Sequence, residues 1–218
     1  MHRAQARDRN AFSKGAFPMI EPRNYSLIAP IYDRLFAKPL EEGHYLIGEL
    51  IEENPHKKFL EVGIGSGLTL EHVIDHDFTG IDISEEMLYE AQVKVLGRHN
   101  IKLHLMDAEK LEFKNNEFDI VMAPSVLTAV ANPEKVFEEM IRVTKPGGMI
   151  VIIAHFSDER QFISRLLDPL TRSFLGFRLD LKLEFFRQYP ELKLLEKRKI
   201  NHWGNMNLSW FLKFEKQR

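Results

Sequence analysis

Short apolar runs alternate along this chain with stretches in which apolar residues recur every three or four positions. Five apolar runs end in turn residues, as buried parallel strands do; they cover residues 58–62, 78–83, 101–106, 118–122 and 149–154. The stretches between them have helical spacing. Two further runs, 192–200 and 206–214, flank a turn signal at His202-Trp203-Gly204-Asn205 and predict an antiparallel hairpin. The pattern predicts an α/β fold with a seven-stranded, mostly parallel sheet, helices on both faces and a C-terminal antiparallel hairpin.

The first apolar run ends in an acid, Glu61, and three glycines at alternating positions, Gly63, Gly65 and Gly67. Glycines are needed where a ligand lies directly on the backbone, because a Cβ would block the approach and such turns often need a positive φ. A dinucleotide-binding turn has its third glycine five residues after the first, where this chain has Leu68. The loop therefore favours a nucleotide-like ligand other than a dinucleotide. A helix is expected directly after it, from the spacing of Leu68, Leu70, Val73 and Ile74.

A second acid, Asp82, ends the next predicted strand, 19 residues after Gly63. In nucleotide-binding α/β units an acid at this position accepts hydrogen bonds from the ribose hydroxyls. Ser84 is expected to cap the following helix and Gly97 to close it. The alternative for Asp82 is a second cap for the same helix.

Composition narrows the class of protein. The length of 218 residues suits one α/β domain with short extensions, and the net charge of −2 argues against a nucleic-acid binder recruited by bulk charge. There is no cysteine, so disulfides and thiolate chemistry are excluded and a cytoplasmic location is the default. No run approaches the roughly 20 apolar residues of a membrane span, and the charged N-terminus lacks the apolar core of a signal peptide.

Two segments are rich in both basic and apolar residues. Residues 1–24 form an arm, either disordered or lying at a membrane interface, and residues 25–218 are expected to form a single domain. Residues 159–178 combine four arginines with three phenylalanines. Such a stripe is more often core packing with a solvated face, although it could also rest on a bilayer.

The pattern Glu61-x-Gly63-x-Gly65-x-Gly67, with the later Lys145-Pro146-Gly147-Gly148 turn before an apolar strand, resembles the class I S-adenosylmethionine-dependent methyltransferases. The resemblance implies a Rossmann-like fold and S-adenosyl-L-methionine as cofactor, with S-adenosyl-L-homocysteine as product and no metal. It implies that Asp107 and Ala108 meet the adenine edge, between the apolar faces of Ile83 and Met87. The implied cofactor residues are Tyr32, Glu61, Gly63, Gly65, Gly67, Asp82, Ile83, Met87, Asp107, Ala108 and Ala123.

Further segments resemble the bacterial phosphatidylethanolamine N-methyltransferases. They are residues 30–36, residues 126–128 with Asn132-Pro133, and His155-Phe156-Ser157. The resemblance implies a lipid or lipid-like methyl acceptor, peripheral contact with an anionic membrane at its cytoplasmic face, and no nucleic acid. The chain departs from the family at Ser125, where an aromatic residue often stands. The sequence leaves the oligomeric state open.

An ethanolamine ammonium must lose a proton before it can accept a methyl group. The candidate catalytic residues for accepting this proton are Tyr32, Asp33 and His155. The candidate substrate-binding residues are Tyr32, Ser125, His155 and Phe156, of which Tyr32 and Phe156 could hold a quaternary product with their aromatic faces. The alternatives are a quinone-ring or small-molecule C- or O-methyltransferase, a non-catalytic cofactor-binding partner protein, and a nicotinamide dehydrogenase.

Overall fold

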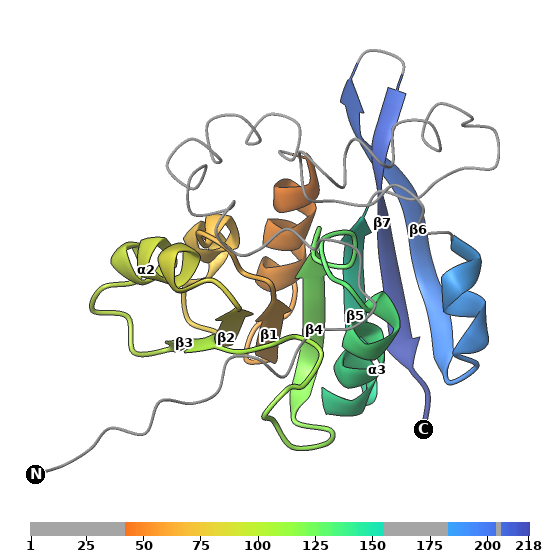
Figure 1. Cartoon of the computed structure of the whole chain (residues 1–218), viewed down its shortest axis with the longest axis horizontal. Helices are drawn as coiled ribbons and strands as arrows, with labels where there is room; N and C mark the ends of the chain where they lie inside the picture. Colours follow the sequence, from red (N-terminus) through yellow and green to blue (C-terminus); the bar gives the residue numbers. More distant parts are fainter. Residues whose placement is uncertain (1–41, 155–182, 204–205) are drawn as a thin grey trace, which may run out of the picture.

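The computed structural model describes residues 42–154, 183–203 and 206–218, and these build one mixed sheet with helices on both faces (Figure 1). The strand order is β3-β2-β1-β4-β5-β7-β6. The first five strands are parallel, and β7 runs antiparallel to both β5 and β6. The strands are β1 (Lys58–Val62), β2 (Asp77–Asp82), β3 (Ile101–Leu105), β4 (Phe118–Pro124), β5 (Thr144–Ala154), β6 (Leu192–Trp203) and β7 (Met206–Lys216). The predicted fold class, including the C-terminal hairpin, is confirmed.

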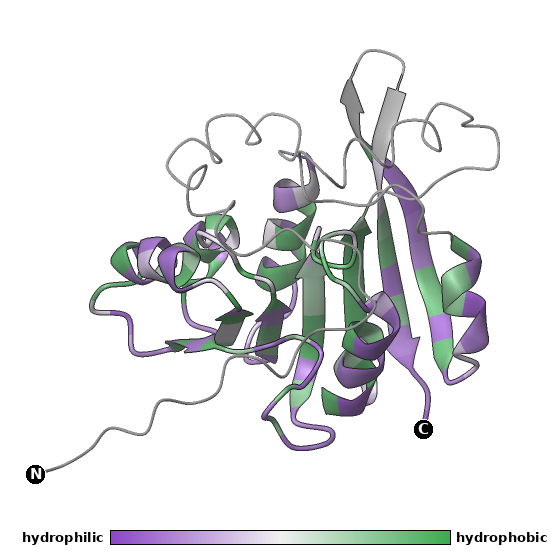
Figure 2. Ribbon diagram, in the orientation of Figure 1, coloured by the Kyte–Doolittle hydropathy of each residue, from purple (hydrophilic) through white to green (hydrophobic). Residues whose placement is uncertain are grey.

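Helical segments cover the two faces of this sheet and bury two apolar clusters. A helix over residues 42–52, the 3₁₀ segment η1 (Leu68–His72) and α2 (Glu85–Lys94) lie over one cluster. The other lies under α3 (Pro133–Val143) and the 3₁₀ segment η2 (Leu183–Gln188). Figure 2 shows hydrophobic residues concentrated in the central strands and hydrophilic ones on the outer turns of α3. Each large apolar side chain fully buried in these layers contributes about 1.5–3 kcal/mol to folding.

The second cluster contains an aromatic group centred on Phe137 of α3. Its ring packs against the rings of Phe186, Tyr189 and Phe214 at centroid distances of 4.9, 5.0 and 6.2 Å, at steep interplanar angles. Edge-to-face pairs of this kind add about 0.5–1.5 kcal/mol each beyond the area they bury. They join α3, η2 and the hairpin, three segments that are distant in the sequence.

Three local expectations are corrected by the structure. The segment after the glycine loop is the short 3₁₀ segment η1 in place of a regular helix, and Ile74 is 69% exposed. Helix α2 ends at Lys94, so Gly97, with φ of 82°, lies in the turn beyond it. Strand β5 begins at Thr144, and a register shift opposite Phe118–Ile120 accommodates the glycine turn that was expected to precede the strand.

Asn132 and Pro133 take the cap and first-turn positions of α3, as predicted, but the Asn132 side chain does not cap the helix. In the described part of the chain, no helix is both long and apolar enough to cross a membrane.

Candidate functional site

The loop between β1 and η1 turns on three glycines that all have positive φ. The angles are 72° at Gly63, 56° at Gly65 and 78° at Gly67. A Cβ added at Gly63 would lie 2.6 Å from Val126 Cγ2, and one added at Gly67 would clash with Leu70. Among the described residues, the atom nearest to a Cβ added at Gly65 is Met87 Cε, at 4.0 Å. Gly63 and Gly67 are therefore needed for close packing, whereas the described residues leave Gly65 space for a ligand, and it forms the floor of a cradle.

Asp82, at the carboxyl end of β2, holds this loop in place. Its Oδ2 accepts a hydrogen bond from the amide of Gly65 at 2.8 Å, and its Oδ1 accepts one from the amide of Ser84 at 2.9 Å. Burial raises the pKa of Asp82, while the amides of Ser84 and Gly65 act in the opposite direction. Ser84 caps α2, because its Oγ accepts the amide hydrogen of Met87 at 3.2 Å. Asp82 thus supports the start of α2, as the cap alternative proposed, and also holds the glycine loop; its contact with a ribose stays a prediction.

Glu61 lies beneath the loop with only 3% of its surface exposed. Its Oε2 accepts a hydrogen bond from the hydroxyl of Thr69, a residue of η1. Burial raises the pKa of Glu61 to about 8; the Thr69 hydroxyl lowers it, and the neighbouring charge of Asp82 raises it further. Two carboxyl groups therefore lie close together under one loop, which favours a ligand that brings a positive charge. Sequence reasoning missed Thr69, although it lies only two residues beyond the last glycine.

Exposed apolar side chains mark the ends of β2 and β3. Ile83 is 60% exposed and Leu105 is 53% exposed, whereas Met87 is buried. The amide of Met106 donates to the carbonyl of Asp82 at 2.9 Å, so the ends of the two strands are joined. Large apolar side chains that are exposed beside a glycine cradle can pack against the two faces of a flat ligand ring. Sequence reasoning named Ile83 and Met87 and missed Leu105, whose exposure at a strand end becomes apparent only in the folded sheet.

The predicted adenine turn follows β3. Asp107 is exposed, and its Oδ1 accepts a hydrogen bond from the amide of Glu109 at 2.8 Å; Ala108 is partly buried between them. The two carboxylate oxygens of Glu109 accept hydrogen bonds from Nδ2 of Asn132 at 2.8 and 2.9 Å, and Lys135 lies 3.8 Å from the same group. The Asn132 side chain therefore ties this turn to the start of α3.

The loop after β4 closes over the cradle from the other side. Ala123 is fully buried in β4. Ser125 has φ of 66°, its amide donates to the carbonyl of Ile153 at 2.6 Å, and its own carbonyl accepts the hydroxyl hydrogen of Thr128 at 3.1 Å. Val126 then contacts the backbone at Gly63. The residues predicted for cofactor binding that the structure describes are thus gathered at the carboxyl ends of β1 to β4.

Four of the predicted site residues lie outside the described residues: Tyr32, Asp33, His155 and Phe156. The basic segments 1–24 and 159–178 also lie outside them. Among residues 42–154, 183–203 and 206–218, no three histidine, aspartate or glutamate side chains converge as metal ligands do.

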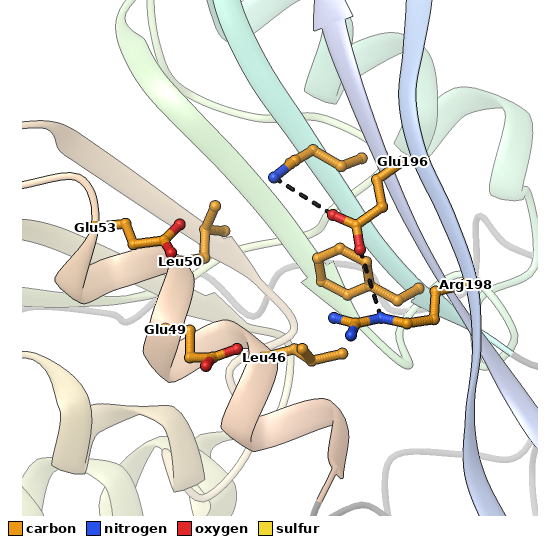
Figure 3. Close-up of a pocket in the computed structure, with 8 residues that line it drawn as sticks. Leu46, Glu49, Leu50, Glu53, Glu196 and Arg198 are labelled. Atoms are coloured by element: carbon orange, nitrogen blue, oxygen red, sulfur yellow. Dashed lines mark ion pairs between the residues drawn. The ribbon is translucent and has the colours of Figure 1, made fainter.

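A cavity of about 270 Å³ lies elsewhere, between the helix over residues 42–52 and the hairpin of β6 and β7 (Figure 3). Its lining residues are Leu46, Glu49, Leu50, Glu53, Glu196, Arg198, Phe211 and Lys213. None of the predicted site residues that the structure describes lines this cavity, so it is separate from the glycine cradle.

Comparison with known proteins agrees with this geometry. The sequence profile of the family described as "Methyltransferase domain" matches residues 60–152. The phosphatidylethanolamine N-methyltransferase of Cereibacter sphaeroides is 36% identical over 194 residues, which cover 86% of this chain and 93% of that protein. The demethylmenaquinone methyltransferase of Staphylococcus saprophyticus is 38% identical over 101 residues, which cover 44% of this chain and 43% of that protein.

Solved structures share the fold at low sequence identity. An S-adenosylmethionine-dependent methyltransferase of Thermotoga maritima superposes with a TM-score of 0.64 at 18% identity, over 89% of this chain and 99% of that one. The N-methyltransferase NodS of Bradyrhizobium japonicum, in complex with S-adenosylhomocysteine, superposes with a TM-score of 0.63 at 14% identity, over 80% of this chain and 86% of that one.

The sheet, the glycine cradle and the matching profile define the chain as a class I S-adenosylmethionine-dependent methyltransferase. Because the similarity to the Cereibacter protein extends over nearly the whole of both chains, this chain belongs to the family of the bacterial phosphatidylethanolamine N-methyltransferases.

Proposed function

We propose that this enzyme N-methylates phosphatidylethanolamine and its partly methylated products toward phosphatidylcholine. The observation that carries the proposal is the 36% identity to a phosphatidylethanolamine N-methyltransferase across 93% of that protein. Similarity limited to a cofactor-binding half would leave the acceptor undefined, whereas similarity over 86% of this chain and 93% of that protein supports a shared acceptor.

The described residues fit S-adenosylmethionine. Gly65 leaves room for a ligand against the backbone, because among the described residues a Cβ at that position would meet only Met87 Cε, at 4.0 Å. Asp82 is positioned to accept hydrogen bonds from a ribose diol, since each carboxylate oxygen has further acceptor capacity beyond its one backbone partner. Glu61 lies where an amino-acid ammonium would offset its burial, and Ile83, Met87 and Leu105 offer apolar surface to a purine.

When bound, S-adenosylmethionine supplies an electrophilic methyl group. The task of the chain is then to align the acceptor amine and to remove its proton. Alignment alone can provide a large part of the rate, with effective molarities of about 10⁵ M or more in well-oriented systems. Tyr32, Asp33 and His155 are the proposed proton acceptors, and Ser125 and Phe156 are proposed to contact the headgroup.

Methylation of a quinone ring is the second candidate function. Its support is the similarity to demethylmenaquinone methyltransferases, which covers 44% of this chain for the Staphylococcus saprophyticus protein. The shorter extent of this similarity makes it the weaker proposal, because a shared cofactor site accounts for it.

Product analysis separates the two candidates. The enzyme is incubated with methyl-labelled S-adenosylmethionine and vesicles that contain both phosphatidylethanolamine and demethylmenaquinone, and the extracted products are separated by chromatography. We expect label in mono-, di- and trimethylated phospholipid. Label in the quinone alone would overturn the proposal, and Asp82→Ala, which removes the proposed ribose acceptor, provides the matched inactive control.

A further inference from the structure

The segment that follows β3 lies alongside α3 and is tied to both ends of that helix (Figure 1). Near the carboxyl end of α3, Nη2 of Arg142 donates to the carbonyl of Leu111 at 2.8 Å, and Oε2 of Glu139 accepts the amide hydrogen of Leu111 at 2.8 Å. At the amino end, Nδ2 of Asn132 donates to the two carboxylate oxygens of Glu109 at 2.8 and 2.9 Å. The tie at Leu111 anchors a buried side chain, whereas the tie between Glu109 and Asn132 lies at the surface, beside the predicted adenine turn.

Hydrogen bonds lead from Asn132 to the carboxylate of Asp107. Asn132 holds the side chain of Glu109, and the amide of Glu109 donates to Oδ1 of Asp107 at 2.8 Å. The amide of Lys110 donates to the carbonyl of Asp107 at 3.1 Å. Among the described residues, Oδ2 of Asp107 has no hydrogen-bond partner, and the residue is exposed. An ionised carboxylate can only accept hydrogen bonds, so Oδ2 selects a ligand that presents a donor.

Packing alone holds this turn weakly. Strand β3 is at the edge of the sheet, where it pairs with β2 only, and its first residue, Ile101, is its one buried residue. A segment with few buried contacts opens at low cost in free energy. The side chain of Glu109 fixes the turn to α3, which packs on the core of the protein.

The use of Asn132 departs from the rule for its position. An asparagine directly before a helix usually caps it with its side chain. Asn132 makes no such cap hydrogen bond and donates to Glu109 instead. Departures from local rules are expected where a residue serves function. Because the other end of this hydrogen-bond chain is the open oxygen of Asp107, the function concerns the ligand that meets this oxygen.

We propose that Glu109 and Asn132 are a positioning pair that makes the site selective for the exocyclic amine of adenine. Neither residue contacts the ligand; both act through the carboxylate of Asp107. With the pair intact, Oδ2 of Asp107 is held where it accepts a hydrogen bond from the amine. With the pair broken, the turn still allows the rest of the cofactor to bind but no longer distinguishes the base. The inference rests on the proposed cofactor site and is independent of the methyl acceptor.

Calorimetry on the full-length protein tests the pair with two ligands. They are S-adenosylhomocysteine and its deamino analogue, in which hydrogen replaces the exocyclic amine. We expect the wild type to bind S-adenosylhomocysteine about tenfold more tightly than the analogue, as one hydrogen bond to a charged group provides. The test variant N132D replaces the donor by an acceptor and sets a second carboxylate against Glu109. Its preference should fall to about twofold or less, while its affinity for the analogue stays within about twofold of wild type.

Two further variants separate the hydrogen bond from charge and from stability. K135Q is the matched control, because Lys135 lies 3.8 Å from the same carboxylate, is 64% exposed, and its loss changes the net charge as N132D does. It leaves the tie intact, so the preference of about tenfold should remain. E109Q/N132D exchanges donor and acceptor, because the glutamine amide can donate to the new aspartate. This double variant should recover most of the preference.

Several results would overturn the inference. They are an undiminished preference in N132D, an equal loss of preference in K135Q, and no recovery in E109Q/N132D. Equal weakening of both ligands by N132D would do so too, because it would indicate a structural role. A wild type that binds both ligands alike would show that the turn does not read the amine. A wild type that binds neither ligand would overturn the cofactor site itself, and the inference with it.

Discussion

Replacing Glu61 by glutamine isolates the charge of the buried acid beneath the glycine loop. Glutamine has the same shape, and its side-chain oxygen can still accept the hydroxyl hydrogen of Thr69. It does not titrate. Burial raises the pKa of Glu61 from 4.5 to about 8, so the wild-type protein and the variant should differ in how their stability depends on pH.

The direction and size of this difference follow from proton linkage. Below about pH 4.5 the carboxyl group is protonated in both the folded and the unfolded chain, and its contribution to stability is fully present. Between that pH and about 8, the unfolded chain releases the proton while the folded chain retains it, so stability falls as the pH rises. For this shift the loss is about 3 kcal/mol between roughly pH 5 and pH 8.

Urea unfolding of the cofactor-free protein at several pH values measures this effect. We expect the stability of Glu61→Gln relative to wild type to increase by about 3 kcal/mol between roughly pH 5 and pH 8. Thr69→Val should make the pH dependence of the otherwise wild-type chain steeper, because it removes the donor that lowers the pKa of Glu61. A constant difference between wild type and Glu61→Gln at all pH values would refute the reasoning, since it would mean that the folded and unfolded chains ionise Glu61 alike.

Three further predictions concern the cradle and the core. Gly65→Ala should cost about 1–2 kcal/mol because of its φ of 56° and should abolish S-adenosylhomocysteine binding in calorimetry. Gly147→Ala, at φ of 75° and with no described neighbour within 4 Å of the added Cβ, should cost a similar amount and leave binding intact; equal binding losses in the two variants would contradict the assignment of the cradle. Phe137→Ala should lower the free energy of unfolding by about 3–5 kcal/mol in urea, because its buried ring joins three segments, and a loss below about 1 kcal/mol would contradict that packing. Wild-type affinity for S-adenosylhomocysteine should rise between about pH 6 and pH 8, because an ammonium on the ligand favours ionised Glu61; calorimetry that detects no proton release on binding would argue against this contact.

The features that could be predicted from the sequence are those set by neighbouring residues. Of the parallel strands, β1, β2, β4 and β5 are apolar runs that are largely buried, and such runs can be recognised without long-range information. The edge strand β3 is more exposed, and only its first residue, Ile101, is buried. The glycines with positive φ and the cap at Ser84 are also local, because a few dihedral angles determine them. The position of Asp82 at the tip of β2 followed from the end of the apolar run over residues 78–83 and from its spacing of 19 residues after Gly63.

The features that could not be predicted depend on contacts between distant segments. The spacing of Leu68, Leu70 and Val73 suits a helix, but η1 ends at His72, and Ile74 is left exposed. Asn132 is of a residue type that often caps helices, yet its side-chain amide instead donates a hydrogen bond to Glu109, 23 residues earlier in the chain. The aromatic group around Phe137 likewise joins segments that are distant in the sequence, and the spacing of apolar residues within each segment does not show that they meet.

The proposed cofactor contacts lie mostly on one side of the sheet. Apart from Ala123 of β4, they come from the carboxyl ends of β1 to β3, which are linked to one another by the hydrogen bonds from Gly65 to Asp82 and from Met106 to Asp82. The loop after β4, strand β5 and the hairpin lie on the other side of Gly63 in the strand order. Apart from Val126, which packs against Gly63, we expect changes on that side to alter the acceptor and to leave the linked cradle intact. A demethylmenaquinone methyltransferase matches 44% of the chain, and a phosphatidylethanolamine N-methyltransferase matches 86%. The acceptor is therefore best tested by substitutions on the β4–β5–hairpin side, which should change the product formed and leave cofactor affinity unchanged.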